Sequence, residues 1–199
     1  SRAGDPFADH IAPHVTIVPP TLIERDCLED LRTHLRRVAA RTAPIRLHMA
    51  GTESFRPVSP VTYLVVASGA EQCDELHRRV RSQEGPLHRP PRFPFHPHVT
   101  LAQGVSDDAL DAAAQEGSAI DAVFIAQNVH LHLLTEDGAW MLLEAPELAG
   151  LDTPKKRVAQ AHHNNPNSPL DARLLAPGLS VSTRVETGSR TKTLTWGDD

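Results

Sequence analysis

The stretch Pro13-His14-Val15-Thr16-Ile17 decides the fold, because the chain repeats it as Pro97-His98-Val99-Thr100-Leu101. Both copies are rich in β-branched and aliphatic residues, which favour strands. Side chains alternate along a strand, so the histidine and threonine of each copy share one face and the two aliphatic residues share the other. Each copy therefore predicts a strand that presents an imidazole and a hydroxyl side by side.

The surroundings of the two copies also match. A helical pattern and a strand-like segment (45–49) follow the first copy, and a helical pattern and a second strand-like segment (122–126) follow the other. A single His-x-Thr often arises by chance, and a surface histidine beside a strand threonine is its ordinary explanation. Recurrence of the order strand, helix, strand indicates internal duplication of one supersecondary unit. We therefore expect the two copies to form one paired site.

The duplicated motif resembles the 2H phosphoesterase superfamily, which is named for two His-x-Thr/Ser motifs, and most closely its bacterial 2'-5' RNA ligase and cyclic phosphodiesterase branch. The resemblance covers roughly residues 10–145. It implies catalysis by His14 and His98 and contact of Thr16 and Thr100 with the substrate. It also implies substrates with 2',3'-cyclic phosphates or 2'-5' linkages.

The expected fold is α+β. We expect two similar lobes from the duplicated unit, each a small and mostly antiparallel sheet with helices outside, around a central cleft. The function expected from this reading is a metal-independent phosphodiesterase acting on 2',3'-cyclic or 2'-5' phosphoester bonds of RNA or nucleotides.

The residue types of the motif suit phosphoester chemistry. Such chemistry needs a base for the nucleophile, an acid for the leaving group and donors for the phosphoryl oxygens. Histidine serves both proton roles because its pKa lies near neutrality. The threonine hydroxyls can donate to non-bridging oxygens. No aspartate cluster suited to Mg²⁺ stands out in the sequence, so no metal or other cofactor is expected.

Two other classes of function stay open on sequence alone. A non-catalytic nucleotide or RNA-end binding module that retains the cleft would keep the same four residues. A metal-binding protein is the weaker alternative, since a His96–His98 pair would still need a third ligand. His130 and His132 share a strand face and are more often solvent-facing than ligands.

Arg56 and Tyr63 are further candidates for substrate binding. Arg56 lies in the polar loop 51–60 and could hold a phosphate, although a solvated arginine is the ordinary alternative. Tyr63 lies in the apolar run 61–67 and could stack on a base, although a core or edge tyrosine is commoner.

Hydrophobic periodicity and capping residues predict the other elements. The strand of the first copy is expected to end at Pro19-Pro20. Helices are expected over residues 22–40, after Ser68 and after Ser106, with Thr21, Ser68 and Ser106 as their respective caps. Residues 61–67 are expected to form a central strand, and residues 122–134 a single strand that pairs with residues 140–143 through a hairpin.

The duplication predicts a gap in the first lobe. The strand at Val61 precedes His98 by more positions than the chain has before His14. The first lobe is therefore expected to be truncated, lacking its opening strand and helix in this chain, unless another segment fills the gap. An unpaired sheet edge would promote self-association, but the oligomeric state is not determined by the sequence.

Composition separates the chain into two parts. Residues 1–150 are expected to form the phosphoesterase-like domain. Residues 151–199 are expected to be a disordered C-terminal tail, because the run 164–169 is polar and turn-forming and the remainder shows little periodicity.

Charge, cysteine and hydropathy narrow the expected partners and compartment. The chain carries a net charge of −5, which argues against a long groove for duplex nucleic acid but does not exclude a small phosphate site. The resemblance implies RNA ends or small nucleotides as partners. Cys27 and Cys73 are expected to be free thiols in a reducing cytoplasm. No signal peptide is visible, and no apolar run approaches the ~18 residues that a membrane span requires.

Overall fold

The computed structural model describes residues 13–91, 93–135, 139–151 and 178–186. In this part of the chain, three helices and a short 3-10 turn, η1, are interspersed with eight strands. In chain order the elements are β1 (His14–Glu24), η1 (Arg25–Cys27), α1 (Leu28–Ala40), β2 (Ile45–Ser54), β3 (Val61–Ser68), α2 (Ala70–Val80), β4 (His98–Gln103), α3 (Asp107–Gly117), β5 (Asp121–Ala126), β6 (Val129–Leu134), β7 (Trp140–Glu144) and β8 (Gly178–Glu186).

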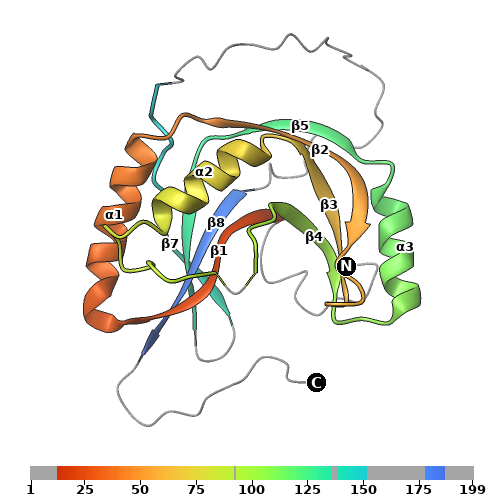
Figure 1. Ribbon diagram of the computed structural model, residues 1–199, viewed down its shortest axis with the longest axis horizontal. Helices are drawn as coiled ribbons and strands as arrows, with labels where there is room; N and C mark the ends of the chain where they lie inside the picture. The colour runs from red at the N-terminus through yellow and green to blue at the C-terminus, as the bar shows by residue number, and fades with distance from the viewer. Residues whose placement is uncertain (1–12, 92, 136–138, 152–177, 187–199) are drawn as a thin grey trace.

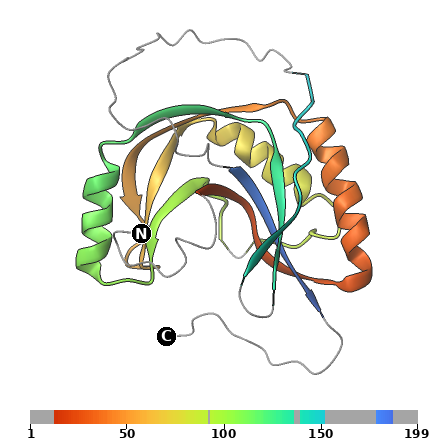
Figure 2. The same cartoon turned by 180° about the vertical axis from the view of Figure 1, so that it is seen from behind.

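The eight strands form one mixed sheet in the order β5-β2-β3-β4-β1-β8-β6-β7. Figures 1 and 2 show the sheet curving as an arch, with α1 and α3 on opposite flanks. The expected α+β class is confirmed. Where two sheets were expected, the structure has one, because β1 and β4 pair in an antiparallel sense at the middle and join the two groups of four strands.

The main core lies on one face of the central strands. Val15 and Val99 are buried there in one cluster with Leu31 and Leu35 of α1 and Leu76 of α2. Burying a side chain of this kind contributes about 1.5–3 kcal/mol to stability. The side chains that alternate with the two valines, including both motif histidines, therefore lie on the opposite face.

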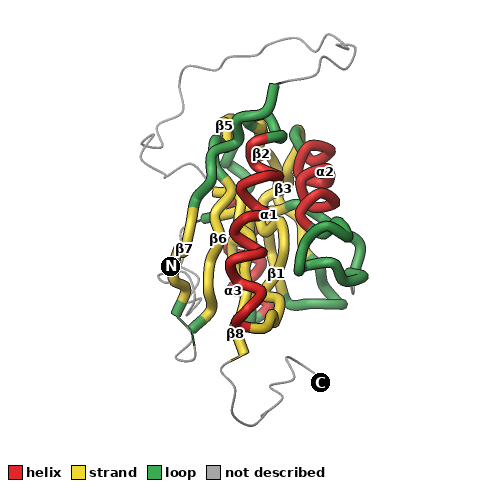
Figure 3. Tube along the Cα trace, turned by 90° about the vertical axis from the view of Figure 1, so that its left-hand side faces the viewer, coloured by secondary structure: helices red, strands yellow, loops and turns green. Residues whose placement is uncertain are grey.

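The helices follow the amphipathic pattern of the sequence. α2 packs against β1, β2, β3 and α1, whereas α3 packs against β2, β3 and β4. Seen from the side in Figure 3, α2 lies at one side of the strands and β7 at the other. Ser106 caps α3 as predicted, since its Oγ accepts a hydrogen bond from Ala109 N. α2 is capped by Gly69 rather than by Ser68, because the cap has a φ of 95°, which favours glycine.

The predicted boundary between the first strand and helix was wrong. β1 continues through Pro19 and Pro20 to Glu24, so Thr21 lies within the strand and is not a helix cap. Register shifts relative to β8 occur between Thr16 and Val18 and between Val18 and Thr21, which lets the strand accommodate the prolines. The Thr21 hydroxyl donates to Pro19 O instead of to a helix.

The single strand predicted over residues 122–134 is two strands. β5 pairs with β2 at one edge of the sheet, whereas β6 pairs with β7 and β8 at the other. The predicted pairing of β6 with residues 140–143 is confirmed by the partners Leu134 and Trp140. The expected turn at residues 136–138 lies outside the described residues.

Residues 178–186 correct the expectation that the segment 151–199 is disordered. They form β8, which runs parallel to β1 on one side and to β6 on the other. Leu179 and Val181 alternate with Ser180 and Ser182, and both apolar side chains are fully buried. This alternation is a strand signal that composition alone obscured. The rest of the expected tail, residues 152–177 and 187–199, lies outside the described residues.

β8 also bears on the expected gap in the first lobe. It occupies the place beside β1 that β3 occupies beside β4. However, β3 is antiparallel to β4, whereas β8 is parallel to β1. Residues 178–186 therefore lie where the duplicated unit would place its opening strand, with the direction reversed.

Candidate active site

The two His-x-Thr motifs meet at the junction of β1 and β4. Val15 and Val99 are register partners in this antiparallel pair. On the two sides of this valine pair, the antiparallel register places His14 opposite Thr100 and Thr16 opposite His98. These four side chains lie on the face opposite the core, which we call the motif face.

The ring of His98 is fixed from two sides. Its Nδ1 lies 2.7 Å from His96 O, and a carbonyl can only accept, so Nδ1 carries the proton and donates. The ring also contacts Phe55 and Tyr63, with centroid distances of 5.0 and 5.1 Å. These contacts set both the tautomer and the orientation of His98, and the neutral ring then has Nε2 as its proton acceptor.

The surroundings of His98 favour its neutral form. Burial lowers its pKa, and the nearby charges of His96 and His14 lower it further, although the hydrogen bond to His96 O opposes the shift. A neutral histidine with one fixed N–H is the form that a general base requires.

A row of polar side chains extends the motif face beyond His14. Thr16 is the register partner of Ser180, and Ser180 is the partner of His130. His132 Nδ1 lies 3.0 Å from Ser180 Oγ. The sequence had indicated that the histidines of β6 face solvent, whereas both are partly buried in this row.

His14 lies within electrostatic reach of this row. Burial lowers the pKa of His130, and the charge of His14 adds to the effect. Burial, then the charges of His130 and His14, lowers the pKa of His132 to about 4. The row is therefore polar and uncharged near neutral pH. This polar row is formed by the pairing of β8 with β6. No local sequence pattern around His14 could therefore have predicted the row.

Tyr63 is a buried neighbour of His98. It is 3% exposed, and its ring packs against Phe55 at a centroid distance of 4.3 Å. Its hydroxyl donates to Glu53 Oε2 at 3.0 Å. Burial and Glu53 raise the pKa of Tyr63 to about 12, so the phenol stays neutral. Phe55 and Glu53 were missed from sequence, because only the pairing of β2 with β3 brings them to Tyr63.

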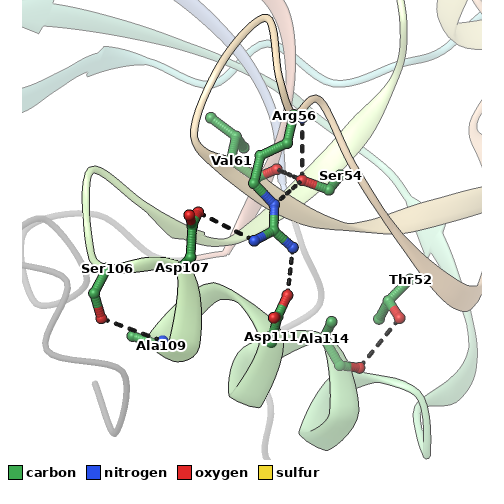
Figure 4. A network of polar contacts seen from close by, with 9 residues as sticks. All are labelled: Thr52, Ser54, Arg56, Val61, Ser106, Asp107, Ala109, Asp111 and Ala114. Atoms are coloured by element: carbon green, nitrogen blue, oxygen red, sulfur yellow. Dashed lines mark hydrogen bonds and ion pairs between the residues drawn. The ribbon is translucent and has the colours of Figure 1, made fainter.

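Arg56 contacts acidic residues of α3. Figure 4 shows its guanidinium, which extends from the loop after β2, between Asp107 and Asp111. Its Nη1 lies 3.1 Å from Asp107 Oδ1. Its Nε also donates to Ser54 Oγ. The hydrogen bonds to Asp111 and Asp107 raise the pKa of Arg56. In this arrangement Arg56 joins the loop after β2 to α3, and its guanidinium hydrogen-bonds to the carboxylates of Asp107 and Asp111.

Within the described residues, no group of three or more His, Cys, Asp or Glu side chains is arranged to hold a metal ion. Two surface hollows, of about 300 and 470 Å³, lie near α1 and α2. Neither is lined by a residue of the two His-x-Thr motifs. Cys27 and Cys73 are free thiols, as expected. None of the described helices is long and apolar enough to cross a membrane.

Comparison with known proteins agrees with the paired motifs. The profile of the 2'-5' RNA ligase superfamily matches residues 1–138. A protein of Bacillus licheniformis named "Putative phosphoesterase" is 31% identical over 142 residues, which cover 70% of this chain and 82% of that protein. A similarly named protein of Geobacillus kaustophilus is 29% identical over 152 residues, covering 72% of this chain and 82% of its own.

A third relative, from Bacillus cereus strain B4264, carries the same type of name. It is 32% identical over 106 residues, which cover 52% of this chain and 58% of that protein. The family match spans both His-x-Thr motifs and the three helices of the described structure. The chain belongs to the 2'-5' RNA ligase superfamily, the family of the 2H phosphoesterases.

Proposed function

We propose that the protein is a phosphodiesterase that opens 2',3'-cyclic phosphates or 2'-5' phosphoester bonds of RNA ends or small nucleotides. The observation that carries this proposal is the Val15–Val99 register, which sets His14 and His98 on one face, each level with a threonine of the other motif. Two proton-transfer groups and two hydroxyls are a sufficient set for phosphoester cleavage without a metal ion.

The roles of the two histidines follow from their surroundings. His98 takes a proton from the attacking water through Nε2, because burial keeps its ring neutral. The water oxygen bonds to phosphorus, and the bond from phosphorus to the leaving ribose oxygen breaks. His14 supplies the proton for that oxygen. In the reverse reaction, which forms the ester, the two histidines exchange roles.

The threonines act on the charge that develops at phosphorus. Thr16 and Thr100 donate hydrogen bonds to the non-bridging oxygens. Thr16 lies on β1 opposite His98, and Thr100 lies on β4 opposite His14. Donors already in place when charge develops lower the barrier without reorganisation. Binding of RNA ends or small nucleotides, rather than of long duplexes, is consistent with the net charge of −5. The free thiols suit a reducing cytoplasm, where we propose that the protein acts.

The test is turnover of 2',3'-cyclic nucleotides and 2'-5' dinucleotides by the purified chain, with and without a chelator. We expect turnover that chelation does not change, and loss of 10²- to 10⁴-fold in His98→Ala. His88→Ala, at an exposed histidine after α2, is the matched control and should retain full activity. Full activity in His98→Ala, or loss in chelator that Zn²⁺ restores, would contradict the mechanism. Nucleotide binding without turnover would instead show a non-catalytic module.

A further inference from the structure

His77 of α2 contacts the backbone of the first motif. Its Nδ1 lies 2.7 Å from Ile17 O, so Nδ1 carries a proton and donates a hydrogen bond to this carbonyl. Ile17 directly follows Thr16 in the chain. The ring is buried, at 7% exposure. Burial lowers the pKa of His77, so the neutral ring, with its proton on Nδ1, is the favoured form.

Ile17 lies at an irregularity of the strand pairing. It is the extra residue at the register shift between β1 and β8, where Thr16 pairs with Ser180 and Val18 with Val181. On the other side, continuation of the β1–β4 register would bring Pro97 opposite Ile17. Proline has no N–H, so Pro97 could not donate a hydrogen bond to this carbonyl. His77 donates a hydrogen bond to Ile17 O close to the Val15–Val99 pair of β1 and β4.

The same ring contacts the segment that leads into the second motif. Phe95 stacks on His77 with ring centroids 4.3 Å apart and an angle of 18° between the ring planes. The next residue, His96, provides the carbonyl that holds His98 Nδ1. The position of Phe95 therefore influences the carbonyl that fixes the tautomer of His98.

We propose that His77 is a positioning residue that holds both His-x-Thr motifs in their mutual geometry, one arm being its hydrogen bond to Ile17 O and the other its stacking on Phe95. Neither arm reaches a reacting atom, so His77 acts through Thr16 and His98. This inference rests on the proposed function for its kinetic consequences, but its structural consequence for His98 is independent of any reaction.

Another buried histidine provides a matched control. His34 of α1 is 2% exposed, and its Nε2 lies 3.1 Å from Val80 O, so it makes the same type of bond to a backbone carbonyl. That carbonyl belongs to the end of α2 and not to either motif strand. His34→Leu removes a comparable buried hydrogen bond without touching the path from His77 to His98.

The kinetic test compares four variants. His77→Leu removes both arms and should lower kcat at least 10-fold with KM within about 2-fold of the original. His77→Asn places an amide N–H near the position of Nδ1, and should recover part of kcat through the Ile17 arm. Phe95→Leu removes only the stacking arm and should fall between them. His34→Leu should leave kcat within about 3-fold, even if its melting temperature falls as far as that of His77→Leu.

The spectroscopic test uses the ring nitrogens of the folded variants. In the original chain, ¹⁵N shifts of His98 should report a neutral ring protonated at Nδ1. In His77→Leu this signature should change to a mixture of tautomers, whereas in His34→Leu it should not.

The two tests separate the failure of this inference from the failure of the proposed function. If the original chain turns over no phosphoester, the proposed function fails and the His98 spectrum alone decides the role of His77. An unchanged His98 tautomer in folded His77→Leu, or equal losses of kcat in His77→Leu and His34→Leu, would overturn the inference.

Discussion

Val15 of β1 and Val99 of β4 are register partners, and this one pair joins the two groups of four strands. Both valines are buried, at 0% and 4% exposure, so the residues on either side of each valine lie on the opposite face. The antiparallel direction then sets each motif histidine level with the threonine of the other motif. A single hydrophobic pair thus brings together residues that are far apart in the sequence.

The two histidines should behave as one catalytic unit. Either His14→Ala or His98→Ala should abolish most turnover, and the double variant should be little worse than either single one, because residues that act as a unit are not additive. The pH dependence of the rate should be bell-shaped. Its two apparent pKa values should belong to the coupled pair of histidines rather than to either residue alone. Steady-state rates of the four combinations measure this. Losses that simply multiply in the double variant would show that the histidines act independently.

The threonine hydroxyls should contribute less than the histidines. Thr16→Val and Thr100→Val keep the side-chain shape and remove one donor to a charged group, so each should cost about 1.5–3 kcal/mol of transition-state stabilisation. That corresponds to a fall in kcat/KM of about 10- to 150-fold. Thr33→Val, at an exposed threonine of α1, is the control. Equal rates in all three variants would exclude both hydroxyls from the reaction.

Arg56 should act with Asp111 if its role is to join the loop after β2 to α3. Arg56→Met and Asp111→Asn should then lower the melting temperature in the same direction and leave KM within about 2-fold. A phosphate-binding role gives a different pattern, in which Arg56→Met raises KM and Asp111→Asn does not. Thermal unfolding and steady-state kinetics on the same two variants distinguish these roles.

Stability should fall as the pH falls below about 6.5. Burial lowers the pKa of His132 to about 4 in the folded chain, so the unfolded chain takes up this proton first. The stabilisation from the neutral ring is complete above the unfolded pKa of about 6.5 and is lost as the pH falls toward 4. At pH 5 the loss should be about 1 kcal/mol, after a discount for the half-exposed ring.

The variant His132→Asn isolates this effect from other acid titrations. Its unfolding free energy should decrease less between pH 7.5 and pH 5 than that of the original chain, as measured by urea denaturation. His88→Asn, at an exposed histidine, should retain the original pH dependence. Identical slopes in the two variants would show that His132 does not contribute.

β8 should be necessary for stability. Leu179→Ala removes a fully buried side chain and should cost about 2–5 kcal/mol. Leu22→Ala, at a leucine that is 41% exposed on β1, should change stability by less than about 0.5 kcal/mol. A chain ending at residue 177 should lose cooperative unfolding, whereas one ending at residue 186 should keep it. Calorimetry of the four chains tests this, and equal melting temperatures would place β8 outside the fold.

The sequence alone determined the parts of this protein that depend on local pattern. Alternation within Pro-His-Val-Thr fixed which side chains share a face, and duplication of the motif predicted that His14, Thr16, His98 and Thr100 belong to one site. The cap at Ser106 and the central position of β3 also followed from local signals. These features were predictable because side-chain periodicity and hydrogen-bond capping act over only a few residues.

Only the tertiary structure decided the features that depend on pairing between distant segments. The separation of β5 and β6 toward opposite ends of the sheet, the insertion of β8 beside β1, and the contact of His77 with Ile17 all depend on residues far apart in the chain. Strand pairing is selected by the burial of a whole face and by the backbone groups left to satisfy, neither of which a local sequence pattern contains. His77 shows this best, since it lies 60 residues from Ile17 in the chain and yet hydrogen-bonds to its carbonyl.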